Sequence, residues 1–551
     1  MLRSLLCLLM LTSSLLWAQG NAPQPRSWTY GLSSPEQWAL ESLDLSQVEA
    51  QDVVNDQDKS MPWRYGIERH LSLDLLSQGQ WIELPDHTMI WRMAIRSPGA
   101  LNISLNFSEF YIPEGGQVQF YNSAQTDWSK VHQTRLSSAQ GFGSWIIQGD
   151  EIVIEYVAQP QTQELPRIIV MSLIHGYRMG ALHQLIDQLD EARGLGDSGD
   201  CHYDVNCSVG EAFDAHRDQL KKAVALLNLG NGYLCSAVLL NNAKEDKTPY
   251  VLTANHCLQN SDPSYWSLRF NWISPDPICG TQDNSADVGT NFTVNGADFR
   301  ASNSRSDFAL VELNQAIPSS WDVAFAGWNN TDDLPEFQVG IHHPKGDVMK
   351  ICRDNDPMAR DTANGTEVWL VKGSDVGGAN GWDLGSTEGG SSGSPLFNHN
   401  GQIIGQLHGG LASCDGEQSN GRYDLYGRFA VAWSSGNGPD QRLRDWLDPD
   451  DLGVEQIDAL ENALSVGDFE LDGLVSVYPN PTRDFVFVQN TKYPQLIGHI
   501  YSLTGQTLMR LDLSATENRI ELSALTPGIY LLYLEDGASG NVVTKKLQIR
   551  P

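Results

Sequence analysis

The sequence predicts an all-β protein made of several domains. With 551 residues, the chain is too long for one ordinary domain. Short runs of alternating apolar and polar residues recur along it, separated by turns rich in glycine and proline, which is typical of antiparallel strands. Every cysteine except Cys7 lies between Cys201 and Cys414, so we expect the middle of the chain to be a domain of its own.

The composition argues against some classes of function. Hydrophobic residues make up 41% of the chain and charged residues 19%, which is ordinary for a globular protein. The formal net charge of -32 argues against a nucleic-acid partner, because binding to phosphates is driven by lysine and arginine. We expect no cofactor.

Residues 1–20 have the features of a signal peptide. Arg3 gives the positive start, residues 5–16 form the apolar core, and Ala18–Gly20 is a suitable cleavage site. A membrane anchor is the alternative, but the apolar run is short, and no later stretch is long and apolar enough for a transmembrane segment. We therefore expect a secreted or cell-surface protein, which can keep disulfides.

The region that follows, residues 21–196, is expected to be rich in β-structure. Its clearest predicted strands are Asn102–Phe107, Gln117–Phe120 and Glu151–Tyr156. A short helix is predicted over Leu182–Arg193, and the glycines of Gly194–Gly199 predict a flexible linker after it.

The rest of the chain divides into a middle domain, a linker and a small C-terminal domain. Residues 197–453 are strand-rich, with many glycines in the loops, and close on a predicted helix, Asp440–Leu447. Residues 454–474 are an acidic linker. Residues 475–551 contain alternating runs such as Asp484–Val488, which predict a β-sandwich.

Three short motifs of the middle domain together indicate a catalytic serine. They are Leu252–Cys257 (LTANHC), Ser306–Leu313 (SDFALVEL) and Gly389–Pro395 (GGSSGSP). We assign His256 as the base that takes the serine proton, Asp307 as the carboxylate that orients it, and Ser392 as the nucleophile. The glycines around Ser392 would let the amides of Gly390 and Ser392 converge on one oxygen, as an oxyanion hole requires.

Each motif alone would be weak evidence, because a histidine before a cysteine or a Gly-Ser loop is usually structural. Asp298 is an alternative acid, but Arg300 follows it and the run is polar, whereas Asp307 opens an apolar strand. The chain order His, Asp, Ser is that of chymotrypsin, not that of subtilisin or the α/β-hydrolases. The three motifs in this order therefore favour catalysis.

The middle domain resembles the chymotrypsin-like serine proteases, and among them the bacterial lysyl endopeptidases. Besides the three motifs, the resemblance is carried by Cys201–Cys207 (CHYDVNC), Ile341–Pro344 (IHHP), Gly405–Gly410 (GQLHGG) and Tyr423–Arg428 (YDLYGR). It implies a double β-barrel with the active site between the barrels. It also implies hydrolysis of protein or peptide substrates on the carboxyl side of lysine.

The resemblance further implies three disulfides. The pairs are Cys201–Cys414, Cys207–Cys279 and Cys235–Cys257. The last pair would close a loop beside His256, which is worth about 3 kcal/mol in the chain-entropy model and would pin the base. Cys352 has no partner in this scheme, and we expect a buried, unreactive thiol.

The same resemblance assigns the substrate pocket. Ser386, at the position where trypsin-like enzymes carry an acid, is neutral, and the acid of lysyl endopeptidases matches Asp424 instead. A carboxylate on the pocket wall suits the compact ammonium of lysine better than a planar guanidinium. His408 and Trp369 match an aromatic pair beside the pocket. The alternatives are a packed core tryptophan for Trp369 and a solvated turn acid for Asp424.

The pair His342–His343 invites a metal interpretation. Histidines followed directly by proline chelate poorly, no carboxylate lies at helical spacing, and no two cysteines have CxxC spacing. We therefore expect both histidines to be structural and expect no metal.

Both flanking regions resemble segments known from exported proteases. Residues 475–551 resemble the C-terminal sorting domain of the type IX secretion system, so the secretion machinery is an implied partner; a carbohydrate-binding sandwich is the alternative. The motifs that carry this resemblance are Val477–Pro481 (VYPNP), Leu525–Tyr530 (LTPGIY) and Thr544–Ile549 (TKKLQI). Residues 21–196 resemble the pro-region of these proteases, with a retained binding module as the alternative.

Three hypotheses about function remain. The first is a lysine-directed serine endopeptidase, the second a serine endopeptidase of another primary specificity, and the third a surface adhesin on an inactive protease fold. Lysyl endopeptidases often release themselves by cutting after lysine, yet Val131–Asp200 contains no lysine. We therefore expect another protease to cut after Arg193, or slow removal of the N-terminal region.

Overall fold

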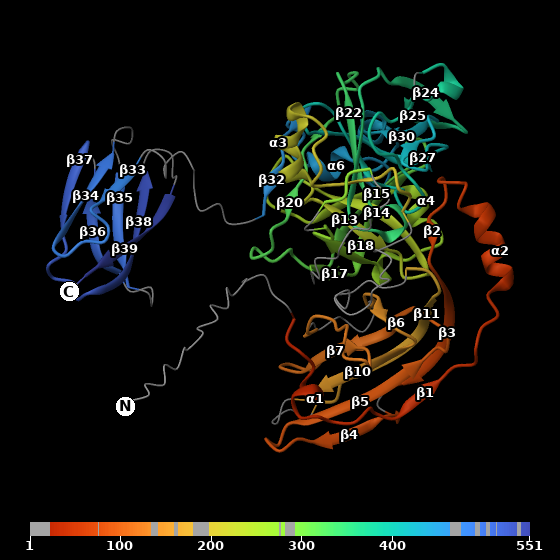
Figure 1. Ribbon diagram of the computed structural model, residues 1–551, viewed down its shortest axis with the longest axis horizontal. Helices are drawn as coiled ribbons and strands as arrows, with labels where there is room; N and C mark the ends of the chain where they lie inside the picture. Colours follow the sequence, from red (N-terminus) through yellow and green to blue (C-terminus); the bar gives the residue numbers. More distant parts are fainter. Residues whose placement is uncertain are drawn as a thin grey trace, which may run out of the picture. The chain divides into compact units, whose positions relative to one another are not determined.

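The computed structural model forms two compact units, Met1–Leu460 and Glu461–Pro551, which are described separately (Figure 1). The residues that the structure describes are 22–74, 77–133, 141–158, 164–179, 198–274, 277–280, 292–378, 380–462, 475–490, 496–502, 507–513, 515–536 and 542–550. The predicted signal peptide, the predicted helix Leu182–Arg193 and most of the glycine linker lie outside them. The finer domain boundaries proposed above stay predictions.

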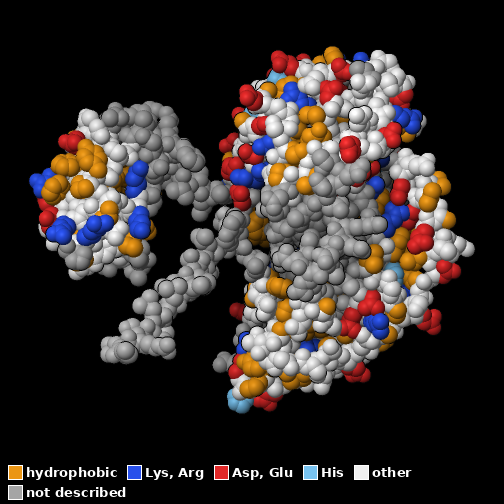
Figure 2. All heavy atoms as spheres, in the orientation of Figure 1, with side chains coloured by type: hydrophobic (Ala, Val, Ile, Leu, Met, Phe, Trp, Pro, Cys, Tyr) orange, Lys and Arg blue, Asp and Glu red, His pale blue; other side chains and the backbone are white. Residues whose placement is uncertain are grey.

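Strands dominate both units, which confirms the all-β fold class. Over the described ranges, no helix has the length and apolar character needed to cross a membrane. Figure 2 shows acidic and basic side chains interspersed on the visible face of the larger unit.

The N-terminal part of the larger unit consists of two stacked sheets. Two helices, α1 (Arg26–Thr29) and α2 (Ser46–Asn55), come early in it. The strands are β1 (Gln37–Ala39), β3 (Gly66–Asp74), β4 (Gln80–Glu83), β5 (Met89–Arg96), β6 (Asn102–Tyr111), β7 (Gln117–Tyr121), β8 (Phe142–Gly143), β9 (Ile147–Gln148), β10 (Glu151–Val157) and β11 (Arg167–Gly176). One sheet has the order β1-β5-β10-β7 with β4 beside β5, and the other β3-β11-β6-β8 with β9 beside β6.

The apolar positions of these strands meet in one core. Phe107, Phe120 and Ile154 are fully buried there, because alternate residues of each strand face the opposite sheet. All three strands predicted from the sequence in this region are present, with β6 longer than expected.

The first sheet of the middle region carries the motifs of His256 and Asp307. Its strands are β13 (Val224–Asn228), β14 (Tyr233–Leu240), β15 (Tyr250–Ala254), β16 (Ser267–Phe270), β17 (Thr293–Asn295), β18 (Ala297–Asn303) and β19 (Phe308–Leu313). Their order is β17-β16-β13-β14-β15-β19-β18, around a core that includes Trp266 and Phe270. A short strand from the N-terminal region, β2 (Trp63–Arg64), pairs with β14.

The second sheet carries the serine motif and the pocket. Its strands are β12 (Tyr203–Asp204), β21 (Trp328–Asn329), β22 (Gln338–His342), β23 (Lys350–Asp354), β24 (Ala359–Ala363), β25 (Thr366–Val371), β26 (Pro395–Phe397), β27 (Ile403–Gly410), β30 (Asp424–Arg428) and β31 (Gln456–Ile457). The main order is β12-β23-β22-β26-β27-β30-β25-β24. Its own core includes Trp382 and Tyr426, and a further cluster with Val238 and Ile341 packs between the two sheets.

Short helices complete the middle region. They are α3 (Glu211–Leu220), α4 (Asn255–Leu258), α5 (Phe429–Ser434) and α6 (Arg444–Leu447). The single helix predicted over Asp440–Leu447 is wrong in extent, because Pro439–Gln441 forms a 3-10 turn and only α6 is α-helical. Arg442 between them is extended (φ -150°, ψ 151°), which breaks the helix.

The smaller unit is a β-sandwich. Its strands are β33 (Val475–Tyr478), β34 (Phe485–Asn490), β35 (Leu496–Tyr501), β36 (Thr507–Asp512), β37 (Glu517–Glu521), β38 (Gly528–Asp536) and β39 (Val542–Ile549). They form the sheets β33-β34-β37 and β36-β35-β38-β39 around a core that includes Val486, Val488 and Leu532.

Candidate active site

The two sheets of the middle region each contribute part of one site. The first sheet supplies His256, on α4 directly after β15, and Asp307, directly before β19. The second supplies Ser392 from the loop before β26, His408 from β27 and Asp424 from the start of β30.

The three disulfides implied by the resemblance are present. They are Cys201–Cys414, Cys207–Cys279 and Cys235–Cys257. The last one ties β14 to α4 and so fixes the helix that carries His256. Cys352 is the free cysteine among the described residues, and burial raises the pKa of its thiol well above the ordinary value, as suits an unreactive group.

Asp307 has an unusual backbone conformation, and several hydrogen bonds fix its side chain. Its φ is 54°, a region that few residues other than glycine, asparagine and aspartate adopt. Its Oδ1 accepts from the His256 amide (3.0 Å), and its Oδ2 accepts from Nδ1 of both His256 and His408 (2.7 Å each). Burial raises the pKa of this carboxyl, but the charges and hydrogen bonds of the two histidines outweigh burial and hold the pKa at about 2.

These contacts define the proton on each imidazole. An ionised carboxylate only accepts hydrogen bonds, so Nδ1 of His256 and of His408 must both carry a hydrogen. In the neutral His256 ring the lone pair is then on Nε2, the nitrogen that a general base needs. That nitrogen is buried and has no hydrogen-bond partner among the described residues.

The same geometry disfavours a metal at this point. His256, Asp307 and His408 bring ligand-type atoms within 4.8 Å of one another. However, a protonated Nδ1 has no lone pair to offer, and both Nδ1 atoms are used in hydrogen bonds to Asp307.

The loop around Ser392 is tightly packed and depends on glycine. Gly390 and Gly393 have φ values of +91° and +80°. A Cβ on Gly390 would lie 2.7 Å from the Lys345 backbone nitrogen, and one on Gly393 would lie 2.1 Å from Thr253 Oγ1. Both positions therefore require glycine.

The Ser392 hydroxyl is engaged by a residue from the N-terminal region. It donates to the carbonyl oxygen of Lys59 over 3.0 Å. The Lys59 side chain continues into a buried pocket, where its Nζ contacts Asp424 Oδ1 (2.5 Å), Thr387 Oγ1 (2.6 Å) and the Ala412 carbonyl (2.6 Å).

The other oxygen of Asp424 has fixed partners. Asp424 Oδ2 accepts from the Trp382 indole N–H (2.8 Å) and from the Thr387 hydroxyl (2.6 Å). Burial raises the pKa of Asp424, although the Lys59 ammonium acts against this. Asp424 is fully buried, so it is not a solvated turn acid.

The polar and cation contacts of Trp369 are to residues other than Asp424. Its indole donates to the Ile404 carbonyl (2.9 Å), and its ring faces the guanidinium groups of Arg360 and Arg428 at 5.3 and 5.5 Å. The core interpretation of Trp369 therefore fits the structure better than the pocket interpretation. The indole at the carboxylate belongs to Trp382, because the loop before Ser392 turns it inward.

The pair His342–His343 is buried and makes local hydrogen bonds. His342 Nδ1 lies 2.7 Å from Ser391 Oγ, and His343 Nδ1 lies 2.9 Å from the Asp347 carbonyl oxygen. Burial lowers the pKa of His343 to about 4, so this ring is neutral at physiological pH. The His342 ring therefore supports Ser391, and the His343 ring closes the turn that leads to Asp347.

Reasoning from the sequence missed four residues of the site. Lys59, Trp382 and Thr387 were not singled out, although Lys59 is one of only two lysines before Asp200. Glu388 was missed as well. Its carboxylate accepts from the Gly199 amide (2.9 Å) and lies 3.2 Å from His202 Nε2, so it holds the start of the middle domain near Ser392.

Comparison with known proteins shows two family resemblances. Residues 195–427 match the model of the lysyl endopeptidase C-terminal domain, and residues 476–550 match that of the secretion system C-terminal sorting domain. A lysyl endopeptidase of Pseudomonas aeruginosa is 26% identical over 374 residues, covering 64% of this chain and 76% of the relative. The sorting domain indicates export through type IX secretion to the cell surface or the extracellular space.

Two solved structures are also similar in part. One is PorZ, a surface component of the type-IX secretion system of Porphyromonas gingivalis (12% identity, covering 57% of this chain and 37% of that one). The other is the BSP domain of a biofilm associated protein (8% identity, covering 89% and 82%). Each has a TM-score of 0.14, which is too low to support an argument.

Proposed function

We propose that this protein is a secreted serine endopeptidase that cleaves peptide bonds on the carboxyl side of lysine. The observation that carries the proposal is the pocket that ends at Asp424, next to Ser392, in which a lysine ammonium has three acceptors within 2.6 Å. An ammonium has three N–H donors, so this pocket satisfies all of them.

In the proposed reaction, the Ser392 Oγ attacks the carbonyl carbon of the substrate lysine while His256 Nε2 takes the hydroxyl proton. The same nitrogen then gives that proton to the leaving amine, and a water molecule hydrolyses the acyl-enzyme by the reverse sequence. Asp307 keeps the other ring nitrogen protonated and stabilises the imidazolium that forms. The amides of Gly390 and Ser392 are the proposed donors to the oxyanion.

The hydrogen bonds of Asp424 favour lysine over arginine. A guanidinium binds carboxylates best through two parallel hydrogen bonds, one to each oxygen. Because Trp382 and Thr387 already occupy Oδ2, only Oδ1 faces the pocket. A single free oxygen suits a point-like ammonium and leaves the second arm of a guanidinium without its acceptor.

The flanking regions complete the proposal. Residues 21–196 serve as a pro-region before the protease domain of residues 197–453. The domain of residues 475–551 targets the protein to the type IX secretion machinery, which fits the family match over residues 476–550. His408, which shares Asp307 with His256, is proposed to help shape the substrate-binding side of the site.

The test is to digest a denatured protein of known sequence with the secreted enzyme and to sequence the products by mass spectrometry. We expect peptides that end in lysine. The matched control, Ser392→Ala, should produce almost none, because removing the nucleophile costs about 10⁶-fold in rate. Fragments that do not end in lysine would favour a serine endopeptidase of another specificity. Equal cleavage by Ser392→Ala would refute the assignment of the nucleophile.

A further inference from the structure

We propose that Lys59 and the turn that carries it form an intramolecular plug that keeps the full-length chain inactive. This inference rests on the proposed function, because it takes the Asp424 pocket to be the substrate pocket. Lys59 is buried, with 3% of its surface exposed, and its ammonium uses the three acceptors that a substrate lysine would need. A substrate cannot enter while Lys59 stays there.

The plug also withdraws the nucleophile from its base. The Ser392 hydroxyl donates its hydrogen to the Lys59 carbonyl, while His256 Nε2 is buried without a hydrogen-bond partner among the described residues. General-base catalysis requires this same hydrogen to point at Nε2. Lys59 therefore blocks both the binding of a substrate lysine in the pocket and the attack by Ser392.

The backbone at Lys59 is bent, unlike that of a bound substrate. Asp58 Oδ1 accepts from the Ser60 amide (2.9 Å) and from the Ser60 hydroxyl (2.6 Å), which closes a turn around Lys59. Peptides that add to a sheet edge bind in extended form. Because Asp58 holds the amide that would leave on cleavage, we infer that the Lys59–Ser60 bond is retained.

One anchor holds the plug on its carboxyl side. Strand β2 pairs with β14 of the first sheet, Arg64 opposite Tyr233 and Trp63 opposite Leu234. Directly after β2, the amide of Tyr65 donates to the Gly232 carbonyl over 2.8 Å. These bonds hold the plug beside the pocket at a high effective concentration.

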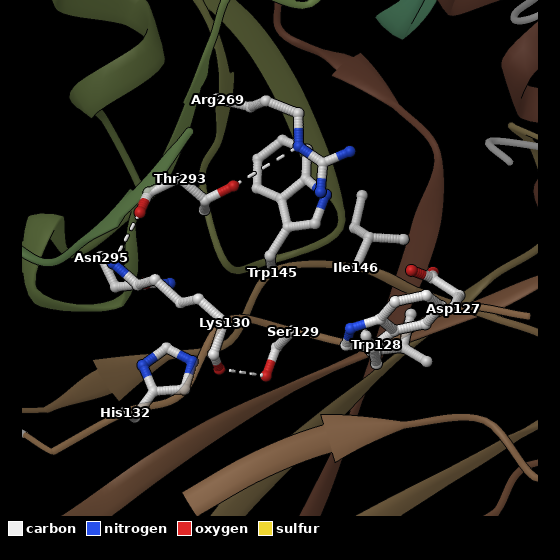
Figure 3. Close-up of a pocket in the computed structure, with 11 residues that line it drawn as sticks. Asp127, Trp128, Ser129, Lys130, His132, Trp145, Ile146, Arg269, Thr293 and Asn295 are labelled. Atoms are coloured by element: carbon white, nitrogen blue, oxygen red, sulfur yellow. Dashed lines mark hydrogen bonds between the residues drawn. The ribbon is translucent and has the colours of Figure 1, made fainter. Parts of the chain in front are cut away.

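A second anchor lies where the N-terminal sheets contact the first sheet of the middle region (Figure 3). The Lys130 ammonium donates to the Thr293 carbonyl over 2.7 Å. The Asn295 amide donates to the Gly143 carbonyl over 2.7 Å. The Arg269 guanidinium lies 4.3 Å from the centre of the Trp145 ring. Because of both anchors, one proteolytic cleavage between the N-terminal and middle regions would leave the plug docked. Activation therefore requires that the N-terminal region be lost.

The test uses the full-length chain, kept uncut and checked by N-terminal sequencing. We would compare wild type with Lys59→Ala for the rate of labelling by a small fluorophosphonate and for hydrolysis of a short lysine amide. We expect Lys59→Ala to react at least about 10-fold faster in both assays, because the fraction of open sites rises. Arg96→Ala is the matched control. It removes another cation of the N-terminal region, and the partner of Arg96, Asp150, is remote from the pocket.

The outcomes separate this inference from the proposed function. If wild type labels and hydrolyses as fast as Lys59→Ala, or if the chain is cut promptly after Lys59, the plug is refuted while the protease assignment stands. If Lys59→Ala remains as inert as Ser392→Ala in both assays, the plug and the proposed protease function are both refuted. Should Lys59→Ala not fold, a synthetic peptide of residues 56–64 replaces it. That peptide must inhibit the secreted enzyme, and its Lys59→Ala version must not; equal inhibition by both would refute the plug.

Discussion

Two buried aspartates of the same site have partners of different kinds. Asp307 receives hydrogen bonds from His256 and His408, which belong to the same middle region of the chain as Asp307 itself. Asp424 has two fixed partners on one oxygen, but the ammonium on its other oxygen comes from Lys59, in the N-terminal region. The pKa falls to about 2 for Asp307 and rises for Asp424.

Under the proposed function, the difference separates a carboxylate that orients the base (Asp307) from one that binds the substrate (Asp424). Partners that never leave can fix a charge and a tautomer, as catalysis at His256 requires. A carboxylate with one oxygen left for an exchangeable cation can instead bind a side chain, because burial makes the empty pocket unfavourable for its charge. The Lys59 ammonium and a substrate ammonium would compete for that single place.

The largest effect expected from this comparison is on the orienting carboxylate. Asp307→Asn should lower kcat by about 10⁴-fold, because an amide stabilises the wrong tautomer of the base. Asparagine tolerates the positive φ at this position, so the backbone should be kept. Steady-state kinetics on a lysine amide measure the change. The matched control is Asp298→Asn, at the exposed acid near Arg300, and a comparable loss there would contradict the assignment.

A smaller effect is expected on stability in acid. The pKa of Asp307 in the folded protein lies below its ordinary value of 3.8, so this group stabilises the fold above about pH 4. That contribution, about 2 kcal/mol for a shift to a pKa of about 2, should be lost as the pH falls from 4 toward 2. Denaturant unfolding across this range should therefore be less pH-dependent for Asp307→Asn than for wild type. If the free energy of unfolding changed equally with pH in both proteins, the histidines would not stabilise the charged form of Asp307.

The parts of the site that are local in sequence could be predicted from it. Asp307 opens an apolar strand and Ser392 sits among glycines, and such patterns are readable because a few neighbouring residues decide them. The predicted helix Asp440–Leu447 is interrupted at Arg442, which is extended, and its neighbour Leu443 is buried in the core. The residues of this segment alone do not specify that packing.

Contacts between distant segments could not be predicted. Lys59 and Asp424 lie 365 positions apart, and no periodicity links them. The contact of Trp382 with Asp424 depends on how the loop before Ser392 folds back onto β30, which the residues of that loop do not specify on their own. Only the three-dimensional packing shows which indole reaches the carboxylate.

The most direct test of lysine recognition measures kcat/KM on matched lysine and arginine amides for the secreted enzyme and its Asp424→Asn variant. We predict a strong preference for lysine in wild type and a loss of about 10²–10³-fold for lysine in the variant, because a buried ammonium would lose its counter-charge. Asp375→Asn, which removes an acid paired with exposed Arg422, should leave both rates unchanged. Equal rates on lysine and arginine in wild type, or an undiminished lysine rate in Asp424→Asn, would contradict the account.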